Sequence, residues 1–250
     1  MSERRRDPSV TLTEAHLEHE QKASITPRGA ARFLVLMALS LTALSLLGQV
    51  ALHVAPDFVV RDRFATTFNV DEEGNIPTLY STLTILGCAL LLWVIARIER
   101  EARGRFSRHW TLMSIVFLGL AVDEFLFLHE EINSRLDLSS VTQWSWVSVG
   151  IVLVFVFAFI FFRMIAHLPP SLRRLFIIAG LIYVSGAIVM ETLGGHYVTV
   201  WGHNSLRYAV CVTSEEFLEM IGIAVFIYAL LKYLTQRGRN VVLTCEVRPD

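Results

Sequence analysis

The sequence has little cysteine and none of the familiar catalytic motifs. Its 250 residues include only Cys88, Cys211 and Cys245, and no CxxC pair occurs. This pattern excludes a disulfide framework and a zinc knuckle. A P-loop, a GxGxxG motif and a nucleophile elbow are also missing from the sequence. The sequence therefore indicates none of the activities that these motifs support.

The N-terminal segment lacks the apolar core of a signal peptide. No apolar run lies close behind Arg4–Arg6, so we do not expect a cleaved signal sequence. Residues 1–28 are polar and are expected to form a disordered cytoplasmic tail. We expect residues 29–234 to form one transmembrane domain and residues 235–250 to form a second cytoplasmic tail. No Gly/Ser-rich linker divides the chain.

Long apolar runs are abundant. Hydrophobic residues make up 54% of the sequence and are concentrated in six segments. Each has about 20 residues, the length that crosses a bilayer core of about 30 Å. The sequence predicts an all-α, polytopic membrane helix bundle with about six transmembrane helices. The segments lie near residues 31–54, 77–97, 110–130, 146–166, 174–194 and 208–233.

Lysine and arginine are unevenly divided between the connections. Both tails and the connections after the second and fourth segments are rich in them. The alternate connections hold only four arginines, Arg61, Arg63, Arg135 and Arg207. By the positive-inside rule both termini face the cytoplasm, and we expect a multi-pass protein of the bacterial inner (plasma) membrane. Because topology alone accounts for the basic residues, nucleic-acid binding is not expected.

Acidic and histidine residues gather near the expected outer ends of the third, fifth and sixth segments. Helical geometry places Glu215, Glu216 and Glu219 within an arc of roughly 100° on the sixth. The glycines Gly194–Gly195 are expected to end the fifth helix. The candidate site residues are Asp123, Glu124, His129, Glu191, His196, Glu215, Glu216 and Glu219.

These acids have no fixed positive partner in the sequence pattern. No lysine or arginine lies in the outer half of any segment, and Arg207 is at the rim. A carboxylate in hydrocarbon costs several kcal/mol unless it is paired, protonated or bound to a metal. Shared protons and bound cations therefore remain as ways to neutralise the group. Carboxylates combined with imidazoles suit Zn, Fe or Mn, which favours a divalent metal ion.

The leading hypothesis is a metalloprotein in the outer half of the lipid bilayer, which would act as an enzyme on a lipid-linked small-molecule substrate. Glu124 and Glu216 would be free carboxylates for acid–base catalysis. The expected metal ligands are Asp123, His129, Glu191, His196, Glu215 and Glu219.

Other interpretations remain open. The acids could mark a cation or proton transport path, although the inner halves of the fourth and sixth segments read IVLVFVFAFIFF and IAVFIYALL. They could instead hold helices together in a non-catalytic scaffold or sensor, or lie in water at helix ends. The sequence leaves open the reaction, the oligomeric state and the role of Glu73, Asn75 and Tyr80.

Three motifs resemble those of a known protein family. DEEGNIPTLYS, AVDEFLFLHEE and SEEFLEMIGIAVFIYALL are similar to segments of a family of bacterial multi-pass membrane proteins with no assigned activity. The resemblance covers about residues 70–233. It implies a six-helix membrane fold and contributes no chemistry.

Overall fold

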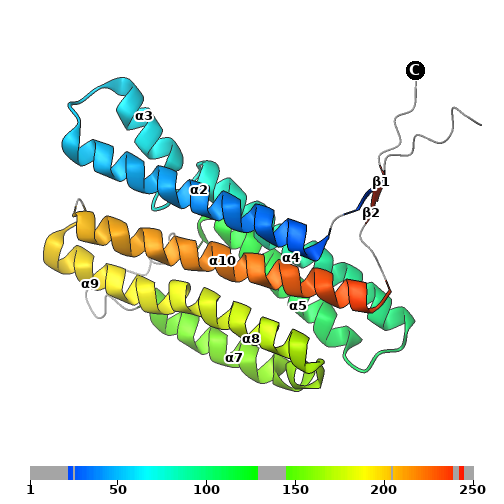
Figure 1. Ribbon diagram of the computed structural model, residues 1–250. Helices are drawn as coiled ribbons and strands as arrows, with labels where there is room; N and C mark the ends of the chain where they lie inside the picture. The colour runs from blue at the N-terminus through cyan, green and yellow to red at the C-terminus, as the bar shows by residue number, and fades with distance from the viewer. Residues whose placement is uncertain (1–21, 25, 129–144, 204, 239–241, 245–250) are drawn as a thin grey trace, which may run out of the picture.

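The chain folds as a bundle of long helices (Figure 1). A computed structural model describes residues 22–24, 26–128, 145–203, 205–238 and 242–244. Within these ranges, six helical spans are long and apolar enough to cross a membrane. The predicted all-α, polytopic membrane bundle is therefore confirmed.

Helices account for almost all of the described chain, with two short strands at its ends. The elements are β1 (Lys22–Ser24), α2 (Pro27–Val54), α3 (Val59–Phe68), α4 (Ile76–Glu101), α5 (Ser107–Leu126), α7 (Ser145–His167), α8 (Pro170–Val184), the π-helix η2 (Ser185–Met190), α9 (Glu191–Trp201), α10 (Leu206–Gln236) and β2 (Val242–Thr244). The helices α8, η2 and α9 run on without a break and form one span.

Side-chain caps mark where several spans begin. Thr26, Asn75 and Ser205 each accept a hydrogen bond from a backbone N–H in the first turn of α2, α4 and α10. Such a cap satisfies one of the N–H groups that have no partner inside the helix. Asn75 also donates to the Asn69 carbonyl oxygen at 2.6 Å. Asn75 therefore has a structural role, as does Tyr80, whose hydroxyl donates to the Leu34 carbonyl oxygen at 2.8 Å.

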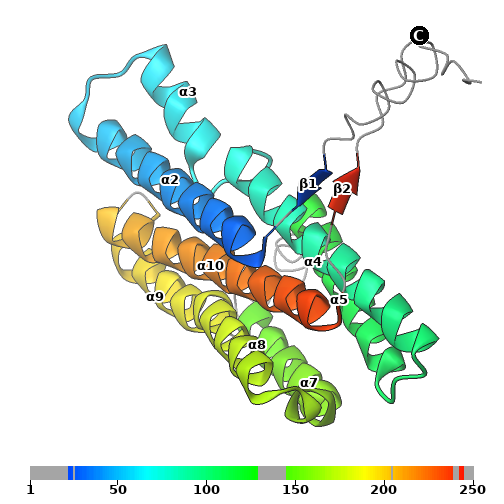
Figure 2. The same cartoon turned by 45° about the vertical axis from the view of Figure 1, so that its right-hand side comes forward.

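The last helix, α10, is the central element of the bundle. It packs against α2, α4, α8, η2 and α9, and both ribbon views show it between them (Figures 1 and 2). Its C-terminal half is buried, with Ala229 and Leu230 fully inaccessible. In contrast, α7 packs mainly on α8 and η2, with a ring contact from Phe161 to His109 of α5, and its Phe159 is 85% exposed. In a membrane, lipid would cover this side of α7.

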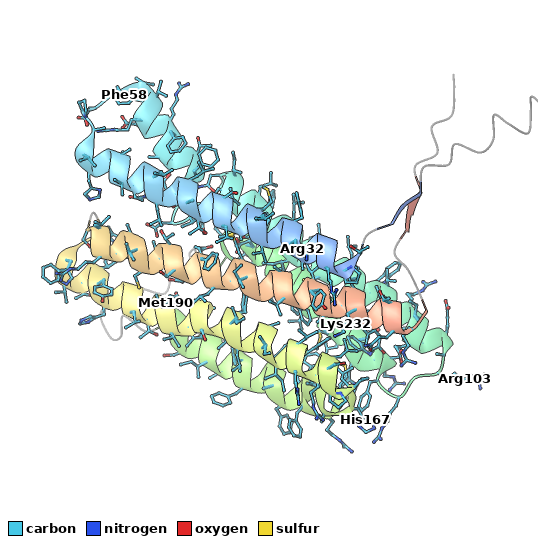
Figure 3. The ribbon with its side chains drawn as sticks, in the orientation of Figure 1. Arg32, Phe58, Arg103, His167, Met190 and Lys232 are labelled. Carbon is cyan, nitrogen blue, oxygen red and sulfur yellow. The ribbon has the colours of Figure 1, made fainter. Side chains whose placement is uncertain are left out.

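The two described strands lie at the same end of the bundle. β1 pairs antiparallel with β2, with Ala23 opposite Leu243. Arg103 and His167 lie toward this end, and Phe58 lies at the opposite end (Figure 3). We call these the strand end and the α3 end. An even number of spans requires both ends of the membrane domain to lie on the same side, as the two strands do. The cytoplasmic location of the strand end stays a prediction.

A short helix that the hydropathy pattern does not predict, α3, folds back along α2. Its close approach depends on Gly48, where a Cβ atom would stand 3.0 Å from the Ala65 Cα. Arg61 fixes the connection by donating to the Ala55 carbonyl oxygen at 2.6 Å and to Asp57 and Asp62 at 2.7 Å. The hydrogen bonds to Asp62 and Asp57 raise the pKa of the Arg61 guanidinium. The mixed polar sequence of α3 carries no clear helical period, which explains why it was missed.

A buried polar group joins α4 to α10 near the strand end. The Glu99 carboxylate is buried, accepts a hydrogen bond from the Tyr233 hydroxyl at 2.7 Å and forms an ion pair with Arg237 at 2.8 Å. The interaction with Tyr233 and Glu99 raises the pKa of the Arg237 guanidinium. This network holds the end of α10 against α4.

We expect Glu99→Ala to lower the free energy of unfolding by about 1–3 kcal/mol, because it leaves the buried Tyr233 hydroxyl without its acceptor. Thermal unfolding of detergent-solubilised protein measures the change. Glu101→Ala is the matched control, since Glu101 is exposed at the end of the same helix. Equal stability of the two variants would show that the network does not stabilise the bundle.

Candidate functional site

Three carboxylates on α10 form the centre of the candidate site. Glu215, Glu216 and Glu219 are half-buried and lie about 14–20 Å along the helix from its start at Leu206. They therefore stand well inside the span. The three side chains face different neighbours, and each brings in acidic groups from another part of the chain.

Glu215 faces α9. A Cβ atom on Gly194 would stand 3.9 Å from the Glu215 Oε2. Glu215 interacts electrostatically with Glu216, Glu191 and Asp71. The Asp71 carboxylate is fixed in place by the Tyr208 hydroxyl, which donates to it at 2.7 Å. The loop before α4 is thus tied to the first turn of α10, next to the carboxylates.

Glu219 lies where η2 packs on α10. A Cβ atom on Gly186 would stand 2.8 Å from the Glu215 carbonyl oxygen and 2.9 Å from the Glu219 Cγ. The Tyr183 hydroxyl is within interaction range of the Glu219 carboxylate. Because glycine alone allows this approach, η2 presses directly on the segment that carries the acids.

Glu216 faces α5 and the loop before α4. It interacts electrostatically with Glu219 and with Glu124 of α5, and also with Asp71 and Glu73. Glu124 interacts in turn with Glu219. Acids of α5, α9 and the loop before α4 therefore each interact with the α10 carboxylates. We call Asp71, Glu73, Glu124, Glu191, Glu215, Glu216 and Glu219 the carboxylate cluster.

The structure brings together most, but not all, of the residues that the sequence suggested. Glu124 and Glu191 interact electrostatically with the α10 acids. Asp123 is half-buried beside Glu124 near the end of α5. His196 is exposed on α9. His129 lies outside the described residues, as do Glu130 and Glu131.

Two predicted helix ends were wrong. Helix α5 ends at Leu126 rather than near residue 130, because Phe127 adopts a left-handed backbone conformation with φ 56°. Helix α9 continues through Gly194–Gly195 to Trp201, and Gly202, with φ 77°, follows its end. In an apolar environment a continuous helix keeps its backbone groups hydrogen-bonded, so glycine alone does not end it. His196 is therefore on a helix and not in a loop.

The sequence does not predict the contribution of Tyr183, and it leaves open whether Asp71 and Glu73 approach the site. Tyr183 meets α10 where Gly222 gives room: a Cβ atom on Gly222 would stand 2.8 Å from the Tyr183 backbone nitrogen. Gly222 lies at the edge of the arc that carries the α10 acids, so its position was a usable signal. No comparable helical spacing predicts the position of the acids in the DEEGN loop, because that position depends on how α3 folds.

The described cluster is rich in oxygen donors. Among residues that the structure describes, no lysine or arginine forms an ion pair with Glu215, Glu216 or Glu219. Within the same ranges, no three His, Cys, Asp or Glu side chains are arranged around a common point in the manner of metal ligands. The cluster thus concentrates negative charge without forming a closed cage. Repulsion among Glu215, Glu216 and Glu219 can be relieved by protons or by a cation.

A known protein family matches most of the chain. Residues 28–234 match the family described as Domain of unknown function (DUF8692). The matched range begins in the first turn of α2 and ends near the end of α10, so it contains all six spans and the carboxylate cluster. No curated protein and no solved structure matches the chain.

Proposed function

Since the chain belongs to the DUF8692 family, whose function is unknown, we propose from its geometry that it binds a divalent cation at the carboxylate cluster, within the outer half of the membrane. We further propose that this centre acts on a lipid-linked substrate. The expected membrane is the bacterial inner membrane, with the α3 end outside.

The observation that carries the proposal is the approach of acids from three other segments to Glu215, Glu216 and Glu219 inside a membrane span. Bringing such groups together is unfavourable unless something offsets their charge. The π-helix η2 supports the proposal, because π-helices are rare and are frequent at functional sites. Its contact with Glu215 and Glu219 places this irregularity at the cluster itself.

The described donors favour a hard cation. They are carboxylates, with the Tyr183 hydroxyl nearby, and His196 is exposed. Oxygen donors suit Mg²⁺ or Mn²⁺, and Mg²⁺ is commonly held by one or two carboxylates while it keeps several waters. A cage of three protein ligands is then not required. Glu216 and Glu124, which interact with each other, are the proposed proton acceptors of the reaction.

A transport path through the membrane is less well supported. Between the cluster and the strand end the bundle is closed by a large apolar core, which includes Leu92, Ile95, Trp110, Phe161 and Leu230. The buried Glu99 carboxylate lies beyond this core, and Tyr233 and Arg237 are its partners. Ion flux into vesicles that contain the purified protein would identify a transporter, and we expect none.

Thermal unfolding with added cations tests the proposal. We expect Mn²⁺ or Mg²⁺ at about 100 times its dissociation constant to stabilise the protein by about 2.7 kcal/mol. The double variant Glu215→Gln/Glu219→Gln should lose this effect. Glu72→Gln is the control, because Glu72 is exposed in the loop before α4. Stabilisation of the double variant equal to that of the wild type would refute the site.

A further inference from the structure

An open groove between α9 and α10 adjoins the carboxylate cluster. Its volume is about 410 Å³, within the range of about 300–1,000 Å³ that is usual for ligand sites. Most of its lining is apolar, and its one charged residue, Arg207, is in the first turn of α10. The lining residues are Met190, Leu193, Tyr197, Leu206, Arg207, Val210, Cys211 and Ser214.

The charge at the rim of the groove is positive and accessible. Arg207 is exposed, and its guanidinium carbon lies 4.2 Å from the centre of the Trp201 ring. Among the described residues no carboxylate forms an ion pair with Arg207. The positive end of the α10 dipole is at the same rim, because the helix begins at Leu206. The rim therefore favours an anion, and Trp201 and Tyr197 are residue types typical of the headgroup level.

We propose that this groove binds one anionic phospholipid, with its phosphate at Arg207 and one acyl chain along the apolar lining. The inference deepens the proposed function by naming the lipid that reaches the carboxylate cluster, and it rests on the membrane placement proposed there. A guanidinium suits a phosphate because it offers paired N–H donors. The apolar wall suits an acyl chain, because a bound chain would pack against these side chains and make close van der Waals contacts with them.

The distance between the rim and the cluster fits this arrangement. Arg207 and Glu215 are eight residues apart on α10, which corresponds to about 12 Å along the helix. The phosphate would thus be separated from the carboxylates by more than a Debye length at physiological salt, about 8 Å. Cys211 of the groove wall interacts with Glu215. The upper part of the acyl chain, rather than the phosphate, would therefore be next to the carboxylate cluster.

Native mass spectrometry of the full chain in detergent tests the inference, with phosphatidylglycerol as the probe and phosphatidylcholine as its zwitterionic counterpart. We expect one phosphatidylglycerol per chain and weaker retention of phosphatidylcholine. Arg207→Gln should weaken phosphatidylglycerol binding about tenfold, the effect of losing one charge-assisted contact. Arg63→Gln is the matched control, since Arg63 is an exposed arginine of α3, away from the groove.

A second variant tests the groove itself. Leu193→Trp should fill the groove and abolish retention of both lipids, and Leu206→Trp serves the same purpose if the first variant does not fold. Both leucines are exposed, at 43% and 48%. Unchanged phosphatidylglycerol binding in Arg207→Gln or in a folded tryptophan variant would overturn the proposal. A wild-type protein that is purified as a dimer without bound lipid would overturn it as well. Cation binding measured on the same samples separates the two proposals. A protein that binds the lipid but no cation would support the lipid groove and contradict the metal centre.

Discussion

Gly222→Ala is expected to have two effects at once: it should destabilise the protein and disturb the carboxylate cluster. The added Cβ atom would stand 2.8 Å from the backbone nitrogen of Tyr183 and 3.0 Å from its Cα. Backbone atoms cannot rotate away, so α8 must move from α10. Such overpacking costs about 1–3 kcal/mol. The same movement would take Tyr183 away from Glu219, and we expect cation stabilisation to weaken.

The control for this variant is Gly180→Ala in α8. A Cβ atom on Gly180 would meet nothing within 4 Å. Alanine is favoured over glycine in a helix by about 1 kcal/mol, so this variant should be more stable than the wild type. Because this helix preference applies to both positions, the free energies of unfolding of the two variants, measured by denaturant titration in detergent, should differ by the overpacking cost of about 1–3 kcal/mol. A Gly222→Ala protein that is as stable as Gly180→Ala would contradict the close packing of α8 on α10.

The double variant Glu216→Gln/Glu219→Gln is expected to be more stable than the wild type when a chelator removes divalent cations. Glu216 and Glu219 are close to each other and to Glu124, and their charges repel. Glutamine has a similar shape and no charge, so the change removes repulsion and part of the desolvation cost. We expect a gain of about 1–3 kcal/mol at a pH where the carboxylates are ionised. Saturating Mn²⁺ or Mg²⁺ should reverse the order, because only the wild type binds the ion.

Thermal unfolding with and without chelator measures both halves of this prediction. Glu72→Gln removes an exposed charge from the nearby loop and should leave stability unchanged in both conditions. A double variant that is less stable than the wild type in chelator would show that the acids stabilise the bundle by themselves. That result would favour the scaffold interpretation over a cation site.

The sequence predicted the spans well, because each one is an apolar run of the required length. The predicted fourth segment, 146–166, corresponds to the helix Ser145–His167. The convergence of Glu191 and Glu124 with the α10 acids was also predictable, since helix direction and helical period fix depth and face. These features depend on local sequence and on the number of crossings.

Features that depend on packing between distant segments were not predictable in the same way. Gly194–Gly195 looked like a helix end, but packing on α10 keeps α9 helical to Trp201. The pairing of β1 with β2 depends on two segments at opposite ends of the chain. Asp71 reaches the cluster only because α3 folds back on α2 and Tyr208 holds the loop. Hydropathy carries no information on such contacts.

The most direct test of the account is the metal content of the protein purified in mild detergent without chelator. Elemental analysis of the wild type should find about one divalent ion per chain, and Glu219→Gln should lose it while Glu72→Gln keeps it. A wild-type protein without any divalent metal, or a Glu219→Gln protein with undiminished content, would contradict the proposal that a cation neutralises the carboxylate cluster.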